Sequence, residues 1–259
     1  MSLVGEERKQ RILELLEEYG KVISVDLANM LNVSKESIRR YLDDLEQEGL
    51  LRKVYGGAIK NYDREEQPHI TRLELHKEEK NRIGQIAAGL VKDGEVLFLD
   101  EGTTPMAIIP HLTKSGLTII TNSWLVVSLL MERAINDLYD GRILWLGGEI
   151  NAKHARSTGP VAEEQLDHYY VDKAFISVDG IDAEAGLTCL DDGKAAISRK
   201  AIAHATETII LTDHSKLGKR YMHRIQWSPA FCIVCDQPLP KEWKPRLAEE
   251  KLKWLTTNE

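Results

Sequence analysis

The stretch from Ser34 to Ala58 reads SKESIRRYLDDLEQEGLLRKVYGGA and decides the fold of the first part of the chain. Ser34 is a favourable residue for the start of a helix. Ile38, Leu42 and Leu45 then recur at the spacing that places apolar side chains on one helical face. The pattern predicts an amphipathic helix whose outward side carries Lys35, Ser37, Arg39, Arg40 and Tyr41.

A short pair of strands is expected after this helix, which we predict to end at Gly49. Residues 50 to 54 have the composition of a strand, and two glycines behind them are typical of a tight turn. Arg52 and Lys53 lie where the wing of a winged helix would meet phosphate. The segment therefore predicts a basic wing.

The residues before Ser34 supply the rest of a DNA-binding module. Arg8 to Tyr19 is amphipathic, Ser24 opens a second short helix, and residues 32 to 34 form a short turn. Two helices joined by such a turn form a helix-turn-helix, whose second helix enters the major groove of DNA. The plainer alternative is a small helical domain with a solvated charged face. In that case the capped helix, the turn and the basic wing would all have to occur together by chance.

The overall charge does not indicate nucleic acid, because the chain carries a formal net charge of -7. The position of the charges is more informative than their sum. Basic residues gather at the start of the predicted recognition helix and in the wing, and acidic residues at the far end of that helix: Asp43, Asp44, Glu46 and Glu48. We expect modest affinity for a single DNA site, and dependence on a homodimer or homotetramer.

Length and composition suggest one further domain. We predict a DNA-binding domain over residues 1–60, a polar linker over 61–75, and an effector-binding and oligomerisation domain over 76–259. The chain has no long apolar run and does not open with a basic and then apolar leader, so we expect a cytoplasmic protein.

Three cysteines fit a reducing compartment without disulfide bonds. Cys232 and Cys235 match a CxxC pattern, but they lie in an apolar run that is typical of a buried strand. Strand alternation directs residues three apart to opposite faces, and the sequence has no second cysteine pair to complete a zinc site. We interpret these cysteines as structural and expect neither metal nor cofactor.

Helices and strands alternate from His76 onward, which predicts a mostly parallel sheet covered on both faces. Ligands of such α/β sheets bind outside the carboxyl ends of the strands. The expected strands are 96–100, 117–121, 143–146, 174–179, 208–211 and 231–235, and the expected helices are 77–92, 104–112, 124–131 and 195–205.

Polar loops follow five of these strands. Residues 100 to 104 read DEGTT and open a helix, so they offer backbone amides, hydroxyls and the positive end of a helix to an anion. The other four loops are Thr121-Asn122-Ser123, Gly147-Gly148, Asp179-Gly180 and Asp213-His214-Ser215-Lys216. A single loop of this kind is an ordinary strand-to-helix turn, but five at one sheet edge predict a binding site.

These motifs resemble those of the DeoR family of bacterial sugar-responsive transcriptional regulators over nearly the whole chain. The resemblance is carried by the winged head and by Arg39-Arg40, Gly56-Gly57-Ala58, Gly102-Thr103-Thr104, Thr121-Asn122-Ser123, Gly147-Gly148, Gly159-Pro160, Asp172 to Phe175, Asp179 to Asp182, Gly186-Leu187-Thr188 and Asp213 to Lys216. It implies a second domain built like ribose 5-phosphate isomerase, no longer catalytic, that binds a phosphorylated sugar and thereby changes the affinity for operator DNA.

The resemblance also implies roles for residues at the strand ends. Asp100 and Asp179 would meet sugar hydroxyls, and Gly147 and Lys194 complete the expected effector site. The phosphate would be held by Gly102, Thr103, Thr104, Asn122 and Lys216.

The chain departs from the family pattern at several positions. Tyr41 replaces an aspartate after the paired arginines, and Tyr55 replaces the usual histidine of the wing. Lys194, Ser198, His154 and His214 also differ from the usual residues, and Glu101 adds a carboxylate beside Asp100. Strand alternation leaves open whether Glu101 points into the site or away from it.

The sequence thus favours a transcriptional regulator, a repressor rather than an activator, that places two recognition helices on paired half-sites of double-stranded operator DNA. The alternative is a sugar-phosphate isomerase, which needs a carboxylate base and a cation that stabilises the enediolate. Asp100, Asp179 and Lys194 are candidates for those roles. A sugar-binding module with a vestigial head is disfavoured by the intact helix cap and the basic wing.

Overall fold

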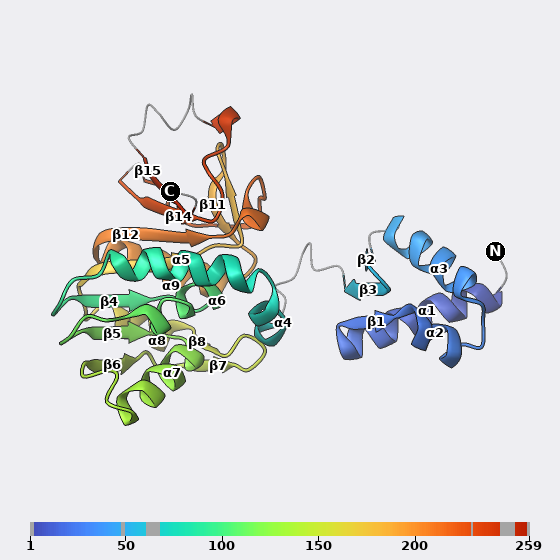
Figure 1. Cartoon of the computed structure of the whole chain (residues 1–259), viewed down its shortest axis with the longest axis horizontal. Coiled ribbons are helices and arrows are strands. Elements are labelled where there is room, and N and C mark those ends of the chain that lie inside the picture. Colours follow the sequence, from blue (N-terminus) through green and yellow to red (C-terminus); the bar gives the residue numbers. More distant parts are fainter. Residues whose placement is uncertain (1–2, 48–49, 61–67, 229, 244–251, 258–259) are drawn as a thin grey trace. The chain divides into compact units, whose positions relative to one another are not determined.

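The computed structural model describes residues 3–47, 50–60, 68–228, 230–243 and 252–257 and divides the chain into two compact units. The first unit comprises Met1–Glu65 and the second Glu66–Glu259 (Figure 1). Each unit has a core of its own, and each is described separately below.

The first unit is a winged helix-turn-helix, as predicted. Its three strands form a sheet in the order β1-β3-β2. Ser34 caps the third helix, because the backbone amide of Ser37 donates to Ser34 Oγ at 3.1 Å. The first strand was not predicted, because three residues are too few to show the alternation of apolar and polar side chains that marks a strand. The elements are α1 Leu3–Tyr19, β1 Lys21–Ile23, α2 Ser24–Met30, α3 Lys35–Gln47, β2 Leu51–Val54 and β3 Gly57–Lys60.

A helix occupies part of the segment that the sequence indicated as a linker. Residues 61–67 lie outside the described residues, but α4 spans His69–Glu74 and belongs to the second unit. The amide of His69 donates to the carbonyl of Lys153 at 3.1 Å, and Arg72 reaches towards a buried carboxylate described below. The helix is stabilised by these tertiary contacts, which the polar local sequence does not indicate.

The second unit is built on a seven-stranded sheet in the order β15-β14-β12-β9-β4-β5-β6. Every neighbouring pair is parallel, so all seven carboxyl ends lie at one edge. The chain builds outward from β4 in one direction and then returns to β9 on its other side, which makes the β4–β9 junction the topological switch point. The strands are β4 Val96–Leu99, β5 Thr118–Thr121, β6 Arg142–Trp145, β9 Val171–Ser177, β12 Ala205–Thr212, β14 Cys232–Cys235 and β15 Lys253–Thr256.

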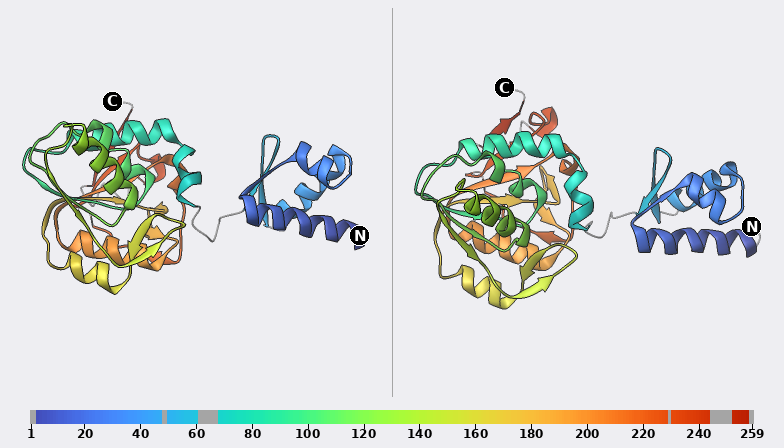
Figure 2. Two further views of the ribbon diagram at one scale, coloured as in Figure 1. Left: turned by 90° about the horizontal axis from the view of Figure 1, so that it is seen from below. Right: turned by 60° about the horizontal axis from the view of Figure 1, so that its bottom comes forward.

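Helices cover both faces of this sheet, and strand alternation builds a core under each (Figure 2). The helices are α5 Lys77–Gly89, α6 Thr103–Met106, α7 Trp124–Ile135, α8 Pro160–Leu166 and α9 Asp192–Ala203, with 3-10 turns η1 Ile109–His111, η2 His214–Lys216 and η3 Lys241–Trp243. In β4, Leu97 and Leu99 belong to the core that also contains residues of α5 and α7, whereas Phe98 belongs to the core that contains residues of α8 and α9.

Two small antiparallel sheets lie outside the alternating pattern. Their strands are only two to four residues long, too short for a sequence period to identify them. They are the hairpin of β7 Glu149–Asn151 with β8 Arg156–Thr158, and the sheet of β10 Gly180–Asp182, β11 Gly186–Cys189 and β13 His223–Arg224.

The predicted strand around the CxxC pattern is confirmed as β14, where Cys235 is buried and Cys232 half-buried. Burial raises the pKa of both thiols, which fits a structural role. None of the helices in the described parts of the chain is long and apolar enough to cross a membrane.

A glycine in α5 provides a test of the packing between α5 and α6. A Cβ at Gly84 would lie 2.2 Å from the carbonyl oxygen of Ala107, whereas a Cβ at Gly89 would meet nothing within 4 Å. We expect Gly84→Ala to lower the free energy of unfolding by about 1 to 3 kcal/mol, as overpacking does. Gly89→Ala should leave it unchanged or raise it by up to about 1 kcal/mol. Urea denaturation of both variants measures the difference, and equal stabilities would contradict the close packing at Gly84.

Candidate ligand site and DNA-binding face

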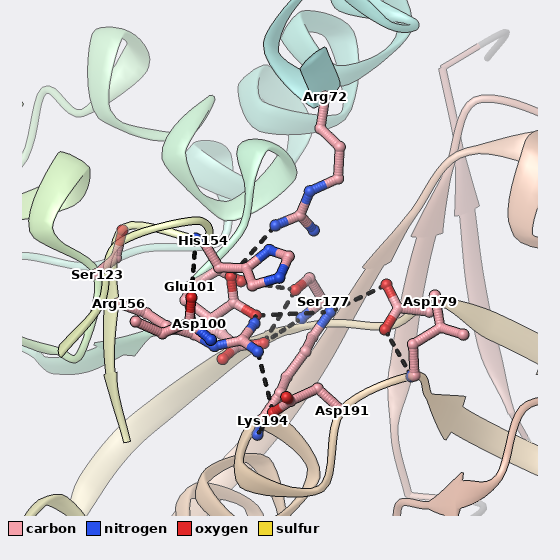
Figure 3. Close-up of polar contacts among 12 residues, drawn as sticks. Arg72, Asp100, Glu101, Ser123, His154, Arg156, Ser177, Asp179, Asp191 and Lys194 are labelled. Atoms are coloured by element: carbon pink, nitrogen blue, oxygen red, sulfur yellow. Dashed lines mark hydrogen bonds and ion pairs between the residues drawn. The ribbon is translucent and has the colours of Figure 1, made fainter. Parts of the chain in front are cut away.

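A cluster of charged side chains, most of them buried, lies at the switch point between β4 and β9 (Figure 3). Its members come from the carboxyl ends of these strands, from β8, from the start of α9 and from α4. We call it the charge cluster, and it consists of Arg72, Asp100, Glu101, Arg156, Asp179, Asp191 and Lys194.

Asp100 bridges the two strands of the switch point. Its Oδ2 accepts hydrogen bonds from the backbone amide of Ser177 at 2.9 Å and from Ser177 Oγ at 3.0 Å. Burial raises the pKa of Asp100 to about 7, and the neighbouring carboxylate of Glu101 adds to this shift. Asp100 is therefore poised to hold a proton near neutral pH.

Glu101 points into the cluster, which settles the orientation that strand alternation left open. Its Oε1 lies 2.5 Å from a guanidinium nitrogen of Arg156 and 3.8 Å from Nζ of Lys194. Burial alone would raise the pKa of Glu101, but Arg156, Lys194 and Arg72 together lower it to about 2. Glu101 is thus a buried carboxylate that stays ionised because cations surround it.

Lys194 connects Glu101 to the end of β9. Its Nζ donates to Asp179 Oδ1 at 3.2 Å, while Asp179 Oδ2 accepts from the amide of Leu190 at 3.0 Å. Burial opposes the charge on Asp179, but Lys194 and Lys216 hold its pKa well below the usual range. Asp191 caps α9 through the amide of Lys194 and also pairs with Arg156 at 2.9 Å.

Arg72 and His154 approach the cluster from the side of α4 and the β7–β8 turn (Figure 3). A guanidinium nitrogen of Arg72 lies 3.7 Å from Glu101 Oε2. Burial, together with the charges of Arg156 and Arg72, lowers the pKa of His154 to about 4, so His154 is neutral at neutral pH. The cations of the cluster are therefore two arginines and one lysine.

Several buried polar atoms near these strand ends have no hydrogen-bond partner among the described residues. They are Asp100 Oδ1, Asn122 Oδ1 and Ser198 Oγ. Lys216 is half-buried in η2 after β12, and its ammonium makes no ion pair or hydrogen bond with any described residue. Buried polar atoms rarely stay unpaired, so these atoms indicate a place for a polar ligand.

The predicted phosphate loop follows β4 as expected, but it is tightly packed. Thr103 and Thr104 are buried at the start of α6, which is only one turn long. Gly102 has φ 140°, and a Cβ there would lie 2.8 Å from Ser177 Oγ. The glycine is thus required by the backbone conformation and by its contact with β9.

Two other predicted ligand residues are engaged with the protein itself. The Asn122 amide group donates to the carbonyl of Ser157 at 3.0 Å and so holds β8 beside β5. The backbone amide of Gly147 donates to Gln165 Oε1 at 2.8 Å, so this amide is engaged by α8, and a role of Gly147 in the effector site stays a prediction.

Sequence reasoning missed Arg72, Arg156 and Ser177. Arg156 lies in a three-residue strand, 55 positions from the carboxylate it pairs with. The only sequence signal was Glu101, since a carboxylate in an apolar strand end requires a cation nearby.

The outward face of α3 carries exposed basic residues. Lys35, Arg39 and Arg40 are exposed, Ser37 is half-exposed, and Arg52 is exposed on β2. Tyr55, in the turn between β2 and β3, is fully exposed at 108% and stands at the tip of the wing. These positions fit a surface that lies against DNA, and their contacts with DNA stay a prediction.

Tyr41 does not face outward, and that part of the prediction is wrong. Its side chain is 8% exposed and packs in the core with Ile38, Leu42 and Leu45. The physical reason is helical geometry, because Tyr41 follows Ile38 by three positions and precedes Leu45 by four. The guanidinium of Arg40 lies 5.9 Å from the centroid of the Tyr41 ring and covers it.

Lys53 is also less available than the sequence suggested. Its ammonium pairs with Asp43, and its amide donates to Glu46 Oε1 at 2.7 Å. The buried Lys9 of α1 pairs with Asp44 at 3.1 Å. Two carboxylates at the far end of α3 are thus neutralised within the first unit, which reduces their repulsion of DNA phosphates.

Comparisons with known proteins agree with this arrangement. A family model described as the DeoR-like helix-turn-helix domain matches residues 8–64, and one described as the DeoR C terminal sensor domain matches residues 75–237. The chain is 36% identical over 238 residues to the HTH-type transcriptional repressor GlcR of Bacillus subtilis (strain 168). The matched region covers 92% of this chain and 90% of that protein. It is 30% identical over 236 residues to the glycerol-3-phosphate regulon repressor of Escherichia coli (strain K12). This match covers 90% of this chain and 92% of that protein.

Among solved structures, the chain is similar to ribose 5-phosphate isomerase A from Methanocaldococcus jannaschii. The two are 23% identical, the match covers 56% of each chain, and the TM-score is 0.39.

The raised pKa of Asp100 predicts a specific pH dependence of stability. In the folded protein Asp100 loses its proton around pH 7, whereas in the unfolded chain it loses its proton around the ordinary aspartate pKa of 3.8. Its contribution to stability is therefore complete below pH 3.8 and is lost as the pH rises towards 7. We expect the unfolding free energy of the wild type, relative to Asp100→Asn, to fall across this window in urea titrations.

The exposed Asp93 supplies the control, because the backbone amide of Ser115 lowers the pKa of its carboxyl. The stability of the wild type relative to Asp93→Asn should not fall in the same window. Parallel pH profiles for the wild type and Asp100→Asn would contradict a raised pKa at Asp100.

Proposed function

The chain belongs to the DeoR family of transcriptional regulators, and from this premise we propose that it is a repressor whose affinity for operator DNA is changed by a phosphorylated sugar. The DNA-binding surface in this proposal is the outward face of α3 with the β2–β3 wing. The effector site is the charge cluster at the β4–β9 switch point together with Lys216.

The observation that carries this proposal is the gathering of four cations at one edge of the sheet. Arg72, Arg156 and Lys194 belong to the charge cluster, and Lys216 acts electrostatically on Asp179 from the end of β12. An ionised phosphate accepts charge-assisted hydrogen bonds, which are about twice as strong as neutral ones. Sugar hydroxyls supply the donors and acceptors that the unpaired oxygens of Asp100, Asn122 and Ser198 need.

Helix α4 is the element that can couple effector binding to the DNA-binding unit. Arg72 reaches Glu101 from α4, while the carbonyl of Arg72 accepts a hydrogen bond from Lys80 Nζ at 2.6 Å. In the sequence α4 is the first described element after β3 of the DNA-binding unit. An anion that competes with Glu101 for Arg72 would shift α4 between two arrangements, and that shift is our proposed route of coupling.

We propose that the second unit has no catalytic activity. A pKa of about 7 at Asp100 is also what a general base needs near neutral pH. Measurement of turnover therefore distinguishes a regulator from an enzyme. The relatives that cover most of the chain are named as regulators rather than enzymes.

The functional form in this proposal is a homodimer or homotetramer in the cytoplasm, where operator DNA lies. Helix-turn-helix proteins read paired half-sites as symmetric assemblies, so two copies of α3 are needed for one operator.

The DNA-binding face leads to a graded prediction. We expect Arg39→Ala and Arg40→Ala to weaken operator binding. Substitution of a residue that contacts phosphate should lower the magnitude of the slope of log affinity against log salt concentration by about 1. Substitution of a residue that reads a base should relax specificity by about 1 to 3 kcal/mol at one position. Lys53→Ala should have a smaller effect, because Asp43 already pairs with Lys53. Fluorescence anisotropy across salt concentrations measures these effects.

Arg82→Ala is the matched control, since it removes the same charge from an exposed position on α5. Binding that is unchanged in both α3 variants would refute the proposed DNA-binding face.

The effector site leads to a second prediction. In thermal unfolding of the full chain we expect phosphorylated sugars to stabilise more than their neutral parents do. A phosphorylated sugar at 100 times its dissociation constant should add about 2.7 kcal/mol to the unfolding free energy. Lys216→Ala should lose this preference. Lys219→Ala, which removes the same charge from an exposed neighbour, should keep it.

The same ligand should shift operator affinity by a coupling of about 1 to 3 kcal/mol, and it should undergo no turnover. Arg72→Ala should reduce this coupling more than it reduces ligand binding, because Arg72 joins α4 to the cluster. Turnover of the ligand with operator affinity unaffected would make the isomerase alternative the better interpretation.

A further inference from the structure

Two histidines and an aspartate meet at the start of α5 and the end of β12, outside the charge cluster. They are His76, Asp213 and His214. One ligand atom from each of the three lies within 4.8 Å of the others, and the two imidazole rings meet edge to face with centroids 4.8 Å apart. Neither histidine has a role in the proposed function.

His214 is held in the way that metal-binding histidines are held. Its Nδ1 lies 2.7 Å from Asp236 Oδ2, and its backbone amide donates to Asp236 Oδ1 at 2.6 Å. Asp236 is 2% exposed, so this contact fixes the ring from the protein side. A carboxylate that binds one ring nitrogen orients the other, Nε2, for a metal ion.

The other two groups also have ligand atoms to offer. One carboxylate oxygen of Asp213 accepts from the amide of Ser215 at 3.0 Å, and its second oxygen makes no hydrogen bond within the described residues. His76 has φ 53°, a left-handed conformation that is uncommon outside glycine, and its side chain does not cap α5. This conformation places the imidazole beside His214 instead.

We propose that His76, Asp213 and His214 bind a divalent transition-metal ion of the zinc class. Two neutral imidazoles and one carboxylate suit zinc and its neighbours in the first transition row, whereas calcium and magnesium prefer oxygen ligands alone. Three protein ligands leave one tetrahedral position open to water or to another small ligand.

The ligand atoms must move closer together for an ion to bind. Metal bonds of about 2.1 Å place tetrahedral ligand atoms about 3.4 Å apart. His76 is half-buried and its ring makes no hydrogen bond to a described residue, so this ring is the one that turns. Lys80 and Lys216 both act electrostatically on Asp213, and their positive charges oppose the binding of a metal ion there. We therefore expect weaker binding than in a closed structural zinc site.

The test is titration of the metal-free full chain, without a histidine tag, with Zn²⁺ in a calorimeter and with Co²⁺ in a visible spectrometer. We expect one equivalent of Zn²⁺, and the visible absorption of tetrahedral Co²⁺ with nitrogen and oxygen ligands. His76→Ala and His214→Ala should each weaken binding more than Asp236→Asn does. Asp236→Asn should itself weaken binding by about 10 to 100-fold, as loss of a supporting carboxylate does.

His168→Ala is the control, because it removes an exposed histidine at the end of α8 and should leave binding unchanged. Far-ultraviolet circular dichroism shows whether each variant is folded, and His76→Gln replaces His76→Ala if the latter is not. Unchanged Zn²⁺ affinity in the folded variants of both His76 and His214 would overturn the proposal. So would a thiolate-to-cobalt absorption band, since it would assign the ion to cysteine.

Discussion

The architecture of the second unit depends on one constraint, the burial of an ionised carboxylate at the switch point of the sheet. Glu101 follows β4 and is fully buried, so it needs compensating cations in fixed positions. Arg156 reaches it from β8 and Lys194 from α9, and each of these residues has a second carboxylate partner. The hairpin, the start of α9 and the ends of two central strands are thereby held to one point.

The charge cluster also explains why α4 belongs to the second unit although its sequence is polar. Arg72 of α4 adds a third cation near Glu101, and Lys80 of α5 donates a hydrogen bond to the carbonyl of Arg72. A helix held by polar contacts of this kind has little apolar burial of its own. Such an element changes position for a small change in free energy, which suits the coupling role proposed for it.

The features predicted from sequence were those with a regular period or a local signal. The capped helix at Ser34, the alternation of helices and strands, and the loop after β4 all follow from short-range patterns. Tyr41 was misplaced because only Ile38, Leu42 and Leu45 were assigned to the apolar face, although the spacing of Tyr41 from Ile38 already put it on that face. Arg156 and Arg72 could not be predicted, because their positions depend on ion pairs between distant segments rather than on neighbours in the sequence.

The linked ion pairs also constrain how this regulator can diverge. Glu101 is shared by Arg156, Lys194 and Arg72, so replacing it alone leaves buried positive charge, and replacing one cation alone leaves buried negative charge. Either single step destabilises the second unit before any new ligand is recognised. A descendant with a different effector would therefore have to exchange charged residues on two or more of these elements together, so the ligand preference of a lineage is expected to change in jumps rather than gradually.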